Sequence, residues 1–124
     1  MEILVAVSIL VVIVGVSLAS FYALNQRSAI NSNADIVRSA VFQARTKTLG
    51  GEGSSHWGVN IASSTVTIFK GSTYNAGSAD NIRYDLNPRA TISDLSISGG
   101  GSNIIFNRLT GETSNAGIST ITFT

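Results

Sequence analysis

The sequence contains no cysteine, only one proline and few charged residues. Without cysteine the chain can form neither a disulfide nor a thiolate metal site. The single proline, Pro88, leaves the whole first part of the chain without a proline helix break. Charged residues make up 12% of the sequence and the net charge is +1, which excludes a strongly basic nucleic-acid module by overall balance.

Charge is missing altogether from one long stretch. No side chain between Ile3 and Leu24 is charged, Glu2 lies at its edge, and the first basic residue is Arg27. Roughly 20 apolar helical residues cross a bilayer, so this stretch is long enough to span one. A cleavable secretory signal would begin with a positive segment and have a shorter apolar core. An ordinary signal anchor would carry Lys or Arg on its cytoplasmic side. We therefore expect a transmembrane segment from which a leader has already been removed.

The opening residues, Met-Glu-Ile-Leu-Val-Ala-Val-Ser-Ile-Leu, resemble the start of mature type IV pilins and type II secretion pseudopilins. In that family an aliphatic residue or Met and a Glu precede the apolar run, and a small β-domain follows the long helix. By this alignment the sequence lacks about three residues of the mature N-terminus, together with the leader-peptidase site. Residues 57–74 and 104–123 resemble the sheet repeats of pseudopilins and minor pilins of the GspH/FimT kind.

The resemblance implies a role for the lone acid. An ionised carboxylate in hydrocarbon is costly unless it is paired, and in the family its partner is the free N-terminal amine of a neighbouring subunit. Glu2 would then set the axial register between subunits. An alternative interpretation places Glu2 at the lipid headgroups, as an N-terminal acid that the helix dipole favours. The residues expected to pack as the filament core are Ile3, Leu4, Val7, Leu10, Val11, Val14 and Leu18.

The sequence predicts an α+β fold, in which a long N-terminal helix packs on a small antiparallel β-sheet domain. Residues 1–49 form the helix, with a transmembrane or filament-core half (1–24) and an amphipathic half (25–49), and residues 50–124 form the β-domain. The helix should run from about residue 2 to about residue 48, a length of about 70 Å, and end at Gly50-Gly51. Helical spacing predicts an apolar stripe of Ile30, Ala34, Val37, Val41 and Ala44, widened by Ile36 and Ala40.

The apolar half of the helix contains two positions at which the helix is expected to be weak. The family's usual proline near the end of the apolar run is absent, and Gly15 and Ser17 are weak points instead, because Gly costs about 1 kcal/mol inside a helix. We expect local loosening around residues 15–20 in a filament; an unbroken helix is the alternative.

In the β-domain, GGEGSS should be a flexible link. The expected strands are His56–Ala62, Thr65–Lys70, Asn81–Leu86, Ala90–Ile97, Asn103–Asn107 and Ser119–Phe123.

The sequence contains few features that are typical of a catalytic or metal-binding site. It has one histidine, His56, no cluster with metal-ligand spacing and no nucleophile-elbow motif. We expect no enzyme activity, no cofactor and no metal site. Four basic residues of the β-domain are candidates for a DNA-binding patch, against the alternative of an ordinary solvated surface: Lys70, Arg83, Arg89 and Arg108.

These observations predict a filament subunit. The helix would sit in the cytoplasmic membrane, be extracted by a membrane assembly machine and pack with identical helices in a homopolymer on the bacterial surface. The first hypothesis is a major pilin of a type IV pilus used for adhesion, twitching motility or DNA uptake. The second is a minor pilin or a pseudopilin of a secretion or competence system, with DNA as a partner. The third is a membrane-anchored binding protein that never polymerises.

Overall fold

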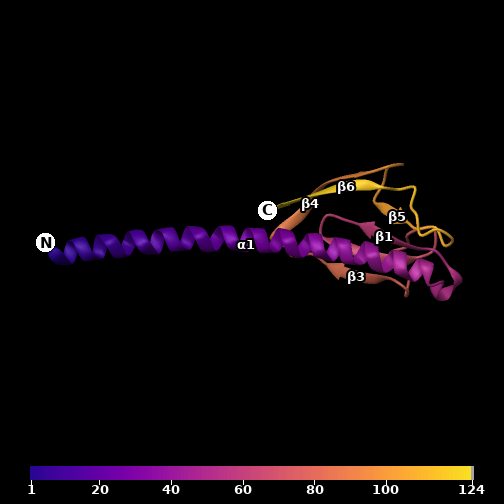
Figure 1. Ribbon diagram of the computed structural model, residues 1–124, viewed down its shortest axis with the longest axis horizontal. Helices are drawn as coiled ribbons and strands as arrows, with labels where there is room; N and C mark the ends of the chain where they lie inside the picture. Colours follow the sequence, from indigo (N-terminus) through magenta and orange to yellow (C-terminus); the bar gives the residue numbers. More distant parts are fainter. Residues whose placement is uncertain (124) are drawn as a thin grey trace.

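The computed structural model describes residues 1–123 and has the shape of a rod joined to a head (Figure 1). The rod is the first half of α1, and the head is built from the second half of α1 and the strands around it. This confirms the predicted α+β class. The elements in chain order are α1 (Glu2–Leu49), the 3₁₀ helix η1 (Glu52–Ser54), β1 (Trp57–Ile61), β2 (Thr65–Lys70), β3 (Ile82–Asp85), β4 (Ala90–Ile97), β5 (Asn103–Ile105) and β6 (Gly117–Phe123).

The helix α1 is continuous, as the lack of proline predicts, and its second half lies against the strands. Its most deeply buried residues are Ala29, Asn33, Ala40, Ala44 and Thr48. Ile36, Val37 and Val41 are half-buried at the edge of the core. The predicted stripe is therefore right for most of its length but wrong at Ala34, which is exposed. The buried face of α1 is rotated towards Ala29 and Asn33, and the Asn33 amide donates to the Ala90 carbonyl at 2.8 Å.

The end of α1 is fixed by a short turn and one salt bridge. Gly50 still has helical torsion angles, and Gly51, with φ of 66°, is the left-handed residue that ends the helix. The ammonium of Lys47 lies 2.7 Å from a carboxylate oxygen of Glu52 and 4.8 Å from the ring centre of Trp57. The Trp57 indole N–H donates to the Glu52 carbonyl at 2.9 Å. The glycine-rich link expected to be flexible thus forms η1 and is held by side chains on both sides.

The strands form two antiparallel units that both pack on α1. The first is a four-stranded sheet in the order β3-β2-β1-β5, in which Val59 of β1 is opposite Ile68 of β2. The second is the two-stranded ribbon β4-β6, with a register irregularity between Ile92 and Asp94. Strands β2 and β4 have the predicted bounds, β1, β3 and β5 are shorter than predicted, and β6 begins earlier.

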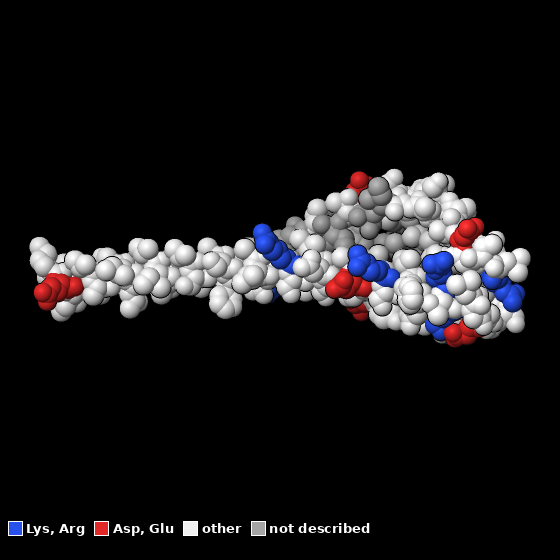
Figure 2. Space-filling view, viewed as in Figure 1, with Lys and Arg blue, Asp and Glu red and all other residues white. Residues whose placement is uncertain are grey.

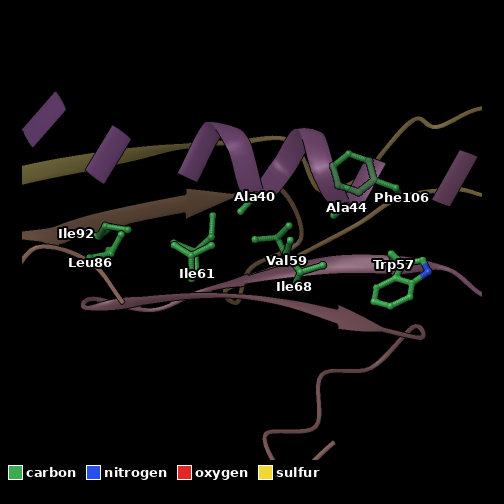
Figure 3. Close-up of a cluster of buried hydrophobic side chains, with 10 residues drawn as sticks. Ala40, Ala44, Trp57, Val59, Ile61, Ile68, Leu86, Ile92 and Phe106 are labelled. Atoms are coloured by element: carbon green, nitrogen blue, oxygen red, sulfur yellow. The ribbon is translucent and has the colours of Figure 1, made fainter. Parts of the chain in front are cut away.

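The hydrophobic core lies between α1 and the first sheet. Figure 3 shows Ala40 and Ala44 of α1 facing Val59 and Ile68 within a layer of apolar side chains. Small alanines on the helix let the strands approach closely, and larger side chains from the strands and loops fill the remaining space. The other members of this cluster are Trp57, Ile61, Val66, Leu86, Ile92 and Phe106.

Candidate assembly interface

The apolar half of α1 makes no buried contact within the structure. The span of α1 that is long and apolar enough to cross a membrane is 0% buried. Figure 2 shows it as an uncharged rod between an acidic tip and the charged head. A contiguous exposed apolar surface of this size marks a site that contacts protein or membrane. The rod is therefore the strongest candidate for a functional surface among the described residues.

The seven predicted packing residues lie along one side of this rod. Ile3, Val7, Leu10 and Val14 follow the spacing of one helical stripe, and Leu4, Val11 and Leu18 repeat every seven residues beside it. They are between 48% and 79% exposed. The two rows lie next to each other, so they form one broad apolar strip that a second helix could cover.

Glu2 lies in the first turn of α1, with Met1 at the N-cap position. Its carboxylate is favourably placed for the helix dipole. No ion pair joins Glu2 to another described residue. The chain itself therefore supplies no counter-charge, and a partner cation must come from outside the subunit if this end of the rod enters an apolar environment.

The serine side chains of the rod form hydrogen bonds with the helix backbone. The hydroxyls of Ser8, Ser17 and Ser20 each donate to the carbonyl four residues earlier, at distances between 2.7 and 3.2 Å. A side chain bonded in this way can enter lipid or a helix interface without leaving an unpaired donor. Around Gly15 and Ser17 the helix is unbroken in the single subunit, and the predicted loosening concerns the filament and stays a prediction.

The four candidate DNA-contacting residues lie on different parts of the head. Lys70 ends β2, and its side chain lies against Gly53 of η1. Arg108 reaches the same turn, with its guanidinium donating to the Ser54 carbonyl at 3.0 Å. Arg83 lies in β3 and pairs with Asp85 at 2.9 Å, while Arg89 is exposed in the turn between β3 and β4. The structure thus brings Lys70 and Arg108 to one turn and places the other two on separate elements.

Two buried polar residues of α1 were missed by the sequence pattern. Asn33 and Thr48 are at most 1% exposed. The Thr48 hydroxyl accepts from the backbone N–H of Trp57 at 3.1 Å and donates to the Ala44 carbonyl at 2.9 Å. These side chains attach the helix to the head and so fix the direction in which the rod leaves it.

Side chains of the kind that hold metals do not gather in the part of the chain that the structure describes. Residues 1–123 contain no group of three or more His, Cys, Asp or Glu side chains that could bind an ion. His56 is half-buried just before β1, and its carbonyl accepts from the Gly71 N–H at 2.7 Å.

In comparisons with known proteins, no family model, no curated protein and no solved structure matches the chain.

Proposed function

We propose that this protein is a structural subunit that polymerises into a filament through the first half of α1. The observation that carries the proposal is the rod itself, which is apolar on all sides and buried nowhere in the subunit. Such a helix is unfavourable in water as an isolated monomer, because burying each exposed Val, Leu or Ile side chain would contribute about 1.5–3 kcal/mol of favourable free energy. It needs either lipid or other helices around it.

In this proposal the rod first spans the cytoplasmic membrane and is then transferred into the filament by assembly machinery. Inside the filament the apolar strip of one subunit packs on its neighbours, and the heads form the outer surface. The contact is heterologous, because one subunit's rod meets a different surface of the next, and such contacts generate open polymers. The resemblance of residues 1–24 to type IV pilins supports the same proposal, which includes a filament on the bacterial surface.

The direct test is electron microscopy of material sheared from cells that make the protein, with antibody labelling to identify it. We expect thin filaments that contain the chain. A protein that remains in the membrane fraction as a monomer, with no labelled filaments, would contradict polymerisation and favour a membrane-anchored binding protein. Short, sparse assemblies that depend on another major subunit would favour a minor pilin or pseudopilin.

A second test uses the acid at the tip of the rod. Glu2→Ala should abolish or disorder filaments while the protein still inserts into the membrane, because the substitution removes a charge and keeps the apolar run. Asp94→Ala is a matched control, since Asp94 is an exposed acid of β4 in the head. Filaments of normal number and order from Glu2→Ala would argue against a register role for this residue.

A further inference from the structure

A groove of about 830 Å³ runs beside α1 where the rod enters the head. Its α1 wall extends from Leu24 to Ala40, and Tyr84 of β3 borders it on the sheet side. Strand β3 is the outer strand of the four-stranded sheet, so this side of the groove has no further strand beside it. The groove therefore begins where the apolar run ends and continues along the same helix.

The residues lining the groove suit the close approach of a helix. Ser28, Ser32 and Ser39 are small, and small residues let two helix backbones come near each other. Ile36 and Tyr84 add apolar contact surface. The Tyr84 hydroxyl donates to the side-chain carbonyl of Gln43 at 2.9 Å, which holds the ring at the border of the groove.

Charge supplies an independent indication of the occupant. Two charged residues line the groove, Arg27 and Asp35, and both are exposed and form no ion pair with any described residue; Arg27 is the only cation among the lining residues. Glu2 is also unpaired, and it is the only charged side chain that precedes Arg27. The two residues lie about 37 Å apart on one straight helix, so they cannot meet within one chain. They can meet between two copies that are shifted along the helix axis by that distance.

We infer that the groove receives the first half of α1 from a second copy of this chain. The two helices run parallel with a shift of about 37 Å, so that Glu2 of one copy meets Arg27 of the other. Ile3 then lies level with Ser28, and Val14 lies level with Ser39. This inference rests on the proposed filament and specifies which surface accepts the rod and which cation pairs with Glu2.

Cysteine cross-linking tests the shift directly, since the natural chain has no cysteine. In filaments of the double variant Ile3→Cys/Ser28→Cys, mild oxidation should link subunits into ladders of dimers and higher multimers. The control Ile3→Cys/Thr46→Cys places the second thiol on an exposed position of the same helix, about 27 Å beyond Ser28. It should give no more than a tenth of the cross-linked product. Equal cross-linking of the two pairs, or none of the first, overturns the inference.

A charge exchange tests the ion pair. Glu2→Lys and Arg27→Glu should each reduce the yield of filaments at least tenfold, and the double variant should recover at least half of the natural yield. Both residues are exposed, so the thermal unfolding of the head checks that the fold is intact. Arg38→Glu, an exposed charge reversal of α1 outside the groove, should assemble.

The outcomes separate this inference from the proposed function. Normal filaments from Arg27→Glu, or no recovery in the double variant, would overturn the Glu2–Arg27 pair and assign Glu2 another cation such as an N-terminal amine. The filament itself would stand in that case. If the unsubstituted protein forms no filaments at all, the proposed function fails and this inference fails with it.

Discussion

Asn33 of α1 and Asn87 of the turn between β3 and β4 are joined by two hydrogen bonds. The backbone N–H of Asn87 donates to the Asn33 side-chain carbonyl at 2.7 Å, and the Asn33 amide donates back to the Asn87 carbonyl at 3.3 Å. The same amide also donates to the Ala90 carbonyl at 2.8 Å. One fully buried side chain thus attaches the start of β4 to the helix.

Asn33→Ala should lower the free energy of unfolding of the head by about 1–3 kcal/mol, because it leaves buried backbone groups without partners. Urea unfolding of the full chain in detergent, followed by the fluorescence of its only tryptophan, Trp57, measures the change. Asn31→Ala, at an exposed position of the same helix, should stay within about 0.5 kcal/mol of the natural protein. Equal effects of the two substitutions would show that the Asn33 bonds contribute nothing specific.

Thr48→Val should also destabilise the head, by about 1–2 kcal/mol, since valine keeps the shape but leaves the buried N–H of Trp57 unpaired. Thr46→Val is a closely matched control. Its hydroxyl makes the same type of bond, to the Phe42 carbonyl at 2.9 Å, but is exposed to solvent. Thermal unfolding should give a lower midpoint for the first variant only. A similar midpoint for both would contradict the role given to Thr48.

Gly15→Ala should stiffen the rod without any change in the head. A Cβ at Gly15 meets no atom within 4 Å, and alanine favours the helix by about 1 kcal/mol over glycine. If the helix loosens around residues 15–20 in a filament, this variant should retain more helix there and assemble with an altered rise per subunit. Electron cryomicroscopy of both filaments measures this. An unbroken helix in the natural filament would show that the loosening prediction is wrong.

Binding of DNA, the partner in the alternative function, should depend on the turn where Lys70 and Arg108 meet. Lys70→Gln and Arg108→Gln should each weaken binding and lower its salt dependence. Arg83→Gln should change binding less, because its guanidinium already pairs with Asp85. Fluorescence anisotropy with a labelled duplex over a range of salt concentrations gives both quantities. Absence of salt-dependent binding in the natural protein would exclude this alternative.

The general architecture could be predicted because it follows from strong local patterns. A long run without proline or charge dictates a helix, and α1 begins and ends within a residue of the expected positions. Short β-type runs between glycine and serine turns located all six strands. The predicted bounds of β2 and β4 agree with the structure. Polar and apolar residues alternate along most of β2, and β4 is the longest strand among those predicted.

The remaining features depend on contacts between distant residues. The sequence does not show that Asn33 is buried, because its partners lie 54 and 57 residues further along the chain. Burial of Phe69 also depends on a neighbouring strand. Its ring lies over Gly58 of β1, on the face of β2 opposite Ile68, and meets Tyr74 edge-to-face at 5.4 Å between ring centres. The groove beside Arg27 also requires the sheet to be placed against the helix. No periodic pattern within α1 could reveal it.

Every buried residue of the described chain lies at or after Ala29. The tertiary fold of the head therefore gains nothing from the first 24 residues, and the two halves of α1 are subject to separate demands. Substitutions in the rod should change its exposed apolar surface, while the melting temperature of the head stays the same. Substitutions in the head core should do the reverse: they should lower the melting temperature of the head and leave the apolar surface of the rod unchanged.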